Sequence, residues 1–226
     1  MSATVKTFSA LYLILLLTSS AVAQTSLNTY DNRGEKHGQW IEYYDNKQSQ
    51  PKFEGKFEHG KRTGLFKFYQ EGLKQPVAIM NFDSNSERVA AKYLAQDGST
   101  ISEGEFTGQQ RTGTWTYYHK DSDAVMMTEH YENGELHGQK KIYYDNGQLA
   151  EEATYNKGQL DGPRKLYSVK GVVLEDLFYK AGKLHGPAKI YNGKGELVSK
   201  GIYENDKHHG TWKYYENGKL KEEKEF

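Results

Sequence analysis

The 226-residue sequence contains no cysteine, no excess of charge of either sign and, after its N-terminal segment, no long apolar run. Without cysteine the chain forms neither disulfides nor cysteine-based metal or catalytic sites, so its stability must come from the packing of neighbouring units. Basic and acidic residues number 30 each, so no net field favours nucleic acid as a partner. Only 36% of the residues are hydrophobic, which argues against a thick aliphatic core.

Two further absences narrow the class of protein. The chain shows no sustained apolar period of 3.6 residues beyond its N-terminal segment, so we expect almost no helix. It has no nucleophile-elbow serine, no HExxH pair and no phosphate-cradling loop, and its carboxylates occupy repeating, structural places. The sequence therefore predicts a protein without enzymatic activity, catalytic residues or cofactor.

The N-terminal segment has the form of a secretory signal peptide. Lys6 supplies a positive charge, residues 8–17 are apolar, and the small-x-small cleavage signal AVA ends at Ala23. The apolar run is too short for a transmembrane helix, and no later segment is apolar enough to span a bilayer. We predict a signal peptide over residues 1–23, a short linker over residues 24–29, and a periplasmic or secreted protein with no transmembrane segment in the mature chain.

Glycine and tyrosine are abundant, with 23 and 18 copies, and both recur at a fixed spacing. A glycine opens an apolar segment every 24–26 residues, except for one gap of 49 in which Arg88 stands at the midpoint. A tyrosine follows each of these eight places by five residues. Such self-similarity indicates a repeat architecture. The repeat glycines, which we assign to turns, are Gly38, Gly64, Gly113, Gly138, Gly162, Gly186 and Gly210; the tyrosine ladder is Tyr43, Tyr69, Tyr93, Tyr118, Tyr143, Tyr167, Tyr191 and Tyr215.

Each repeat contains two segments of strand length separated by glycine-containing turns. Pairs such as Asn146-Gly147 are typical of two-residue hairpin turns, because both residues accept positive φ. Apolar side chains alternate with lysines in the segments after the later repeat glycines, which indicates two different sheet faces. The sequence predicts an all-β fold, an elongated single-layer antiparallel β-meander of about eight consecutive hairpin repeats of ~24 residues. The array covers residues 30–226 and is degenerate around residues 73–105.

The unit from Tyr131 to Leu149, YENGELHGQKKIYYDNGQL, resembles the MORN-repeat variant of bacterial proteins, often grouped as YwqK-family antitoxin-like proteins. The resemblance extends over residues 30–226 and departs from the motif at Arg88. It implies a twisted sheet of consecutive hairpins that serves as an interaction or scaffold module. Some MORN arrays have been proposed to touch phospholipid, and the family name leaves an antitoxin role open.

Histidines directly before repeat glycines raise the possibility of a metal site. Equivalent places in neighbouring repeats lie about 9.5 Å apart, since each repeat is two strands at about 4.8 Å per strand. Zinc, however, holds its ligands at about 2.0–2.2 Å. We therefore predict turn chemistry and no metal site for these residues, which are His37, His137, His185 and His209.

Two side-chain rows remain as candidate binding elements. The tyrosine ladder could stack sugar rings, but we favour a core role because the sheet has no second layer. A lysine stripe could contact anionic lipid or glycan, but we favour cross-strand pairing with acids. The lysines are Lys141, Lys165, Lys189 and Lys213, and the acids are Glu151, Glu152, Glu175, Glu222 and Glu223.

The sequence thus predicts an exported, non-enzymatic repeat protein that binds a protein partner as an interaction or scaffold module. One alternative is binding of cell-envelope glycan or phospholipid, and another is an antitoxin or immunity role. A nucleic-acid partner is not expected.

Overall fold

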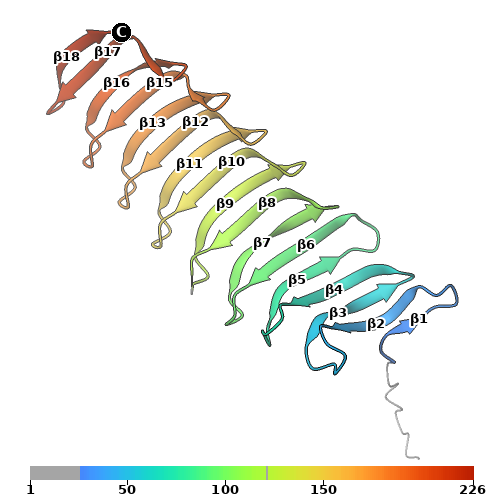
Figure 1. Ribbon diagram of the computed structural model, residues 1–226. Helices are drawn as coiled ribbons and strands as arrows, with labels where there is room; N and C mark the ends of the chain where they lie inside the picture. The colour runs from blue at the N-terminus through green and yellow to red at the C-terminus, as the bar shows by residue number, and fades with distance from the viewer. Residues whose placement is uncertain (1–25, 121) are drawn as a thin grey trace, which may run out of the picture.

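A computed structural model describes residues 26–120 and 122–226, and its strands form one antiparallel sheet (Figure 1). Within these ranges there is no helix, and hence no helical segment that could cross a bilayer. The predicted signal peptide lies outside the described residues. The strands are β1 (Thr29–Tyr30), β2 (Lys36–Tyr43), β3 (Pro51–Glu58), β4 (Lys61–Tyr69), β5 (Pro76–Phe82), β6 (Arg88–Leu94), β7 (Thr100–Thr107), β8 (Gln110–Tyr118), β9 (Val125–Glu132), β10 (Glu135–Tyr143), β11 (Leu149–Asn156), β12 (Gln159–Tyr167), β13 (Val173–Lys180), β14 (Lys183–Leu184), β15 (Gly186–Tyr191), β16 (Leu197–Glu204), β17 (Lys207–Glu216) and β18 (Lys219–Glu225).

Strands that are neighbours in the sequence are also neighbours in the sheet. Each strand pairs with the next one along the chain, while the short β14 and β15 share one position and both pair with β13. Figure 1 shows the hairpins side by side along an elongated, twisted ribbon that ends at the C-terminus. At about 4.8 Å per strand the ribbon is roughly 80 Å long. The predicted single-layer meander of eight hairpin repeats is confirmed, with β1 added at its start.

One face of the sheet, here called the inner face, carries most of the buried side chains. Phe66 and Trp115 are 0% exposed and Trp212 is 2% exposed. These residues belong to one cross-strand row, because side chains alternate between faces along every strand. The row runs through Trp40, Gly55, Phe66, Met80, Ala91, Gly104, Trp115, Glu129, Lys140, Ala153, Arg164, Leu177, Ala188, Gly201 and Trp212.

Large rings on the inner face lie flat on glycines of the neighbouring strand. A Cβ atom added at these glycines would lie only 2.3–2.5 Å from ring atoms, closer than real Cβ atoms approach anything. The missing side chain therefore lets a sheet without a second layer bury large rings against its own backbone. The pairs are Phe66 on Gly55, Trp115 on Gly104 and Trp212 on Gly201.

The buried side chains of the inner face are mainly aromatic near both ends of the ribbon and partly charged between them. Aromatic clusters lie near both ends, one built on Trp40, Phe53, Phe57 and Phe66 and the other on Leu177, Ala188 and Trp212. Strands β9–β13 carry ion pairs on the same face, here called the ionic segment. Glu129, whose side chain is 10% exposed, binds Lys140 at 3.0 Å. Arg164 binds Glu151 at 2.7 Å and Glu175 at 3.0 Å, so charged side chains take places of the central row that rings occupy elsewhere.

Six of the repeat glycines lie inside strands and Gly186 begins β15, so none lies in the turn predicted for it. All seven have positive φ, from 64° at Gly210 to 124° at Gly162. An extra residue that shifts the register of a strand is a β-bulge, and glycine with positive φ suits that place. The register shifts at six of these glycines, Gly64, Gly113, Gly138, Gly162, Gly186 and Gly210.

Arg88 takes the glycine place in the third repeat, and no bulge forms there. The register between β5 and β6 runs unbroken from Ala78 to Phe82. Residues 83–87 make a wide loop where most repeats have a two-residue turn. The degenerate region around residues 73–105 thus contains a hairpin without its bulge.

Candidate interaction surface

The tyrosine ladder lies mainly on the outer face, which is the face of the sheet opposite the inner face. Three of its hydroxyl groups donate hydrogen bonds to acids of the preceding strand: Tyr69 to Glu54 at 2.8 Å, Tyr118 to Glu103 at 2.5 Å and Tyr167 to Glu152 at 2.6 Å. All eight rings are half-buried, and none belongs to the buried core of the described residues. The ladder therefore ties strands together on the outer face and does not form the core that the sequence analysis favours.

Tyr93 differs from the other seven ladder tyrosines. In their repeats the register shifts just before the tyrosine, whereas in the third repeat it shifts after Tyr93, so Leu94 takes the ladder place. Tyr93 pairs with Ala78 and lies on the inner face, with its ring 6.2 Å from that of Trp115. The hairpin without a bulge thus moves this tyrosine to the other face.

The ladder predicts how stability depends on alkaline pH. Burial, together with the hydrogen bond to glutamate, raises the pKa of Tyr69 and Tyr167 to about 12. These folded-state values lie above the unfolded value of about 10, so the stabilisation is complete below about pH 10 and is lost as the pH rises toward 12. We expect the urea midpoint to fall between pH 9 and pH 11.5, and to fall less in Tyr167→Phe. An equal fall in parent and variant would contradict this assignment.

Lysines of the outer face have acidic neighbours along most of the ribbon, and near its C-terminal end Lys200 lies between two other lysines. Lys67 binds Glu54 at 2.8 Å, and Lys165 lies opposite Asp176. The expected pairing with acids is only partly found: Glu152 and Glu223 lie on the outer face, while Glu151 and Glu175 bind Arg164 on the inner face and Glu222 lies opposite the inner-face Tyr214.

Three lysines of β15–β17 form a row with no acid between them, and an acid lies at each end of the row. Lys189 lies opposite Asp176. Lys189 lies opposite Lys200, and Lys200 lies opposite Lys213. Lys213 binds Glu223 at 2.8 Å, and the ammonium group of Lys200 lies over the ring of Tyr215 at 5.7 Å. Like charges directly opposite one another destabilise a sheet, so a negatively charged partner would reduce the repulsion between these lysines.

An exposed apolar row runs beside these lysines on the same face. Pro163 lies opposite Phe178, and Pro187 lies opposite Ile202, on strands β12 to β16. Phe178 is 39% and Ile202 is 50% exposed. The C-terminal outer patch, as we call the two rows together, consists of Pro163, Phe178, Pro187, Ile202, Lys189, Lys200 and Lys213.

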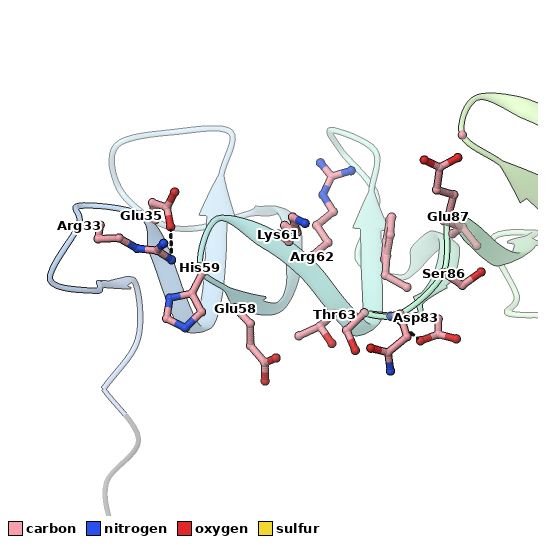
Figure 2. A pocket seen from close by; sticks show the side chains of 15 residues that line it. Arg33, Glu35, Glu58, His59, Lys61, Arg62, Thr63, Asp83, Ser86 and Glu87 are labelled. Carbon is pink, nitrogen blue, oxygen red and sulfur yellow. Dashed lines mark hydrogen bonds and ion pairs between the residues drawn. The ribbon is translucent and has the colours of Figure 1, made fainter.

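A hollow lies at one edge of the sheet, between the β3–β4 turn and the wide loop of residues 83–87 (Figure 2). It has a volume of about 970 Å³ and mixes acidic and basic side chains. None of its lining serines or threonines, all within the described ranges, shares a hydrogen bond with a lining histidine or carboxylate, so it presents no activated nucleophile. The labelled lining residues are Arg33, Glu35, Glu58, His59, Lys61, Arg62, Thr63, Asp83, Ser86 and Glu87.

Comparison with solved structures gives only distant likeness. A mutant of S. aureus TarM in complex with fondaparinux, alpha-GlcNAc-glycerol and UDP shows 12% identity over 59% of this chain and 21% of its own, with a TM-score of 0.27. A crystal structure of TarM shows 12% identity over 57% and 21%, with a TM-score of 0.25. The chain spans about a fifth of these proteins. No curated protein matches the sequence.

A family model described as MORN repeat variant matches residues 136–157 and 209–226. The first segment covers most of β10 and β11, and the second covers most of β17 and all of β18. Both are therefore single hairpins of the repeat defined by glycine and tyrosine spacing. At least two of the eight repeats thus match the MORN repeat variant, a non-enzymatic module that generally binds proteins or lipids.

Proposed function

We propose that the protein is an exported repeat protein that binds a protein partner as an interaction or scaffold module. The observation that carries this proposal is the C-terminal outer patch, where exposed Phe178 and Ile202 stand beside the uninterrupted lysine row. Bulky apolar side chains at the centre of an interface supply most of its affinity, and surrounding charges select the partner. The partner is therefore a protein with an acidic rim around an apolar contact.

The extended sheet supports this role. Its repeats contact only their neighbours, so a partner can bind along several of them without opening the fold. The outer face of β12–β17 lies under no other element of the described chain. An immunity or antitoxin function would be a special case of the proposal, with an exported toxin as the acidic partner.

Export is the part of the proposal that rests on residues 1–23. The expected result is that the chain, expressed in a Gram-negative host, is recovered from the periplasm or medium with Gln24 as its first residue. Intact protein confined to the cytoplasm would contradict export without affecting the interaction proposal, because the two rest on different residues.

A second candidate, binding to an anionic phospholipid surface or acidic glycan, is favoured by the lysine row alone. Three adjacent cations attract phosphate or carboxylate groups of any source, with strong dependence on salt. Flotation with vesicles containing phosphatidylglycerol, and retention on purified cell-wall glycan, test this candidate.

The test of the proposal combines capture with variants of the patch. The tagged chain is exposed to envelope proteins, and a recovered partner is purified and titrated against the parent, against Phe178→Ser with Ile202→Ser, and against Leu65→Ser. Leu65 is 65% exposed on the same face but far from the patch, so it is the matched control. We expect the double variant to weaken binding at least about tenfold and the control to leave it unchanged. Equal binding by all three, or retention only on vesicles or glycan, would overturn the proposal.

A further inference from the structure

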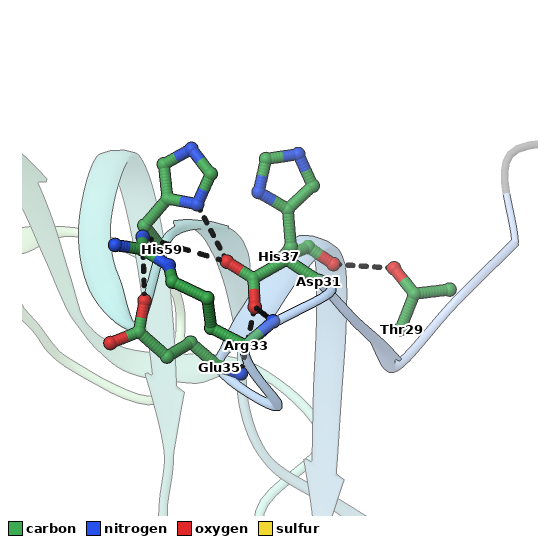
Figure 3. A network of polar contacts seen from close by, with 6 residues as sticks. All are labelled: Thr29, Asp31, Arg33, Glu35, His37 and His59. Carbon is green, nitrogen blue, oxygen red and sulfur yellow. Dashed lines mark hydrogen bonds and ion pairs between the residues drawn. The ribbon is translucent and has the colours of Figure 1, made fainter.

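Three side chains that commonly bind metals converge at the N-terminal end of the ribbon (Figure 3). Asp31 comes from the loop after β1, His37 from β2 and His59 from the β3–β4 turn. One potential ligand atom from each lies within 4.8 Å of the other two, and among the described residues this is the one such group of three. The two imidazole rings are 5.0 Å apart between centroids, and His59 Nδ1 lies 2.6 Å from Asp31 Oδ2.

The carboxylate of Asp31 is held in position by the loop. Its Oδ1 accepts backbone N–H hydrogen bonds from Arg33 at 2.9 Å and Glu35 at 3.0 Å, which leaves Oδ2 directed at His59. The side chain is only 8% exposed. The group is therefore an oriented oxygen donor.

His37 contributes a nitrogen that no described residue satisfies. Its Nδ1 is buried and has no hydrogen-bond partner. Buried polar atoms are nearly always paired, because an unpaired one keeps the cost of losing its water. Figure 3 shows the His37 ring beside that of His59, with Asp31 below the two rings. A cation between these side chains would supply the missing partner.

We propose that Asp31, His37 and His59 bind a divalent transition-metal ion, with Zn²⁺ as the best match. Two imidazoles and one carboxylate form a donor set that Zn²⁺ accepts with three protein ligands, and the fourth position is left to water or to a group from a partner. With zinc–ligand distances of about 2.0–2.1 Å, ligand atoms stand about 3.3 Å apart, so the contact between His59 and Asp31 must lengthen slightly. Arg33, which is 59% exposed, lies 3.7 Å from Asp31 and binds Glu35 at 2.8 Å, so Glu35 holds this guanidinium when Asp31 binds the ion.

This proposal revises the expectation of no metal site. That expectation compared histidines at equivalent places of successive repeats, whereas these three ligands occupy non-equivalent places. Of the three, only His37 directly precedes a repeat glycine. A bound ion would fasten the loop after β1 and the β3–β4 turn to β2, and thereby close the first end of the ribbon.

Isothermal titration of the full chain, purified without a histidine tag, with ZnCl₂ tests the proposal. We expect one site per chain, and at least about a tenfold loss of affinity in His37→Ala, which leaves the hydrogen bond between Asp31 and His59 in place. Asp31→Asn is the second variant, because its amide oxygen still accepts the loop N–H groups while the charge is removed. His137→Ala and His209→Ala are the matched controls. These histidines also precede repeat glycines, but they lie outside the proposed site, and each is close to a glutamate instead, at 3.5 Å and 3.4 Å.

Hydrogen exchange gives a readout that a purely structural role would not change. Zn²⁺ should slow amide exchange in residues 29–38 and 58–61 of the parent but not of His37→Ala. The proposal is overturned if Zn²⁺ binds with no single-site stoichiometry, if His37→Ala binds as tightly as the parent, or if affinity is lost in His209→Ala instead.

Discussion

Replacement of Trp115 by alanine is expected to lower the free energy of unfolding by about 3–5 kcal/mol. The ring is 0% exposed, lies on Gly104, and has Phe106 edge-on at 5.0 Å and the Arg111 guanidinium over it at 4.2 Å. Its indole N–H donates to the carbonyl of Glu105 at 3.1 Å. The change therefore leaves a cavity and an unpaired carbonyl in a middle repeat, whose neighbours depend on it for contacts.

Urea unfolding followed by far-ultraviolet circular dichroism measures this effect without relying on tryptophan fluorescence. Leu65→Ala is the matched control, because Leu65 lies on the outer face and is 65% exposed. It should change the free energy of unfolding by less than about 0.5 kcal/mol. A loss below about 1 kcal/mol in Trp115→Ala would mean that the flat-lying rings do not hold the sheet together.

Gly201→Ala is expected to destabilise the protein by about 1–3 kcal/mol through overpacking. The added methyl group would lie 2.3 Å from the ring of Trp212, so either the ring or strand β16 must move. The usual benefit of replacing glycine by alanine, a less flexible unfolded chain, is about 0.4–1 kcal/mol and has the opposite sign. The clash is the larger effect because the ring is held on its other sides by Tyr203 at 5.0 Å and His208 at 3.9 Å between centroids.

Gly193→Ala is the matched control for Gly201→Ala. Gly193 lies in the turn between β15 and β16, has no positive φ, and its added Cβ would meet nothing within 4 Å. Its replacement should leave stability within about 0.5 kcal/mol of the parent or raise it. In a double-mutant cycle, Gly201→Ala should destabilise the protein less in the Trp212→Leu background, because the smaller leucine side chain moves away from the added methyl group. Equal costs in both backgrounds would show that the clash is not with this ring.

The periodic features of the fold follow from the sequence because they depend on local spacing. Repeat glycines and tyrosines give the number of hairpins, and two-residue turns give their direction. The face on which the ladder lies also follows from the sequence, because Tyr167 is two residues from Lys165 and side chains two residues apart in a strand share a face. The lack of a second layer favours a core role instead, whereas in the structure the hydroxyl groups of Tyr69, Tyr118 and Tyr167 bind carboxylates of the outer face.

Other features depend on register, which local spacing does not specify. Glycine with positive φ suits a turn and a bulge equally well, so the place of Gly138 inside β10 could not be told from its residue type. The position of Tyr93 follows from a hairpin that lacks its bulge. The contact of Trp115 with Gly104 requires the pairing of β7 with β8. The cluster of Asp31, His37 and His59 requires the loop after β1 to fold back, and no repeat pattern signals that.

The change from aromatic rings to ion pairs along the inner face affects the order in which parts of the sheet unfold. Rings hold the two ends, while β9–β13 are joined on that face by Arg164, Glu129 and their partners. Partly exposed ion pairs weaken as salt screens them, whereas contacts between rings do not. Each repeat is stabilised only by its neighbours, so the ionic segment is a boundary across which cooperativity is weakest. We therefore expect the chain to unfold as two coupled units, with either end retaining its structure after the middle has opened.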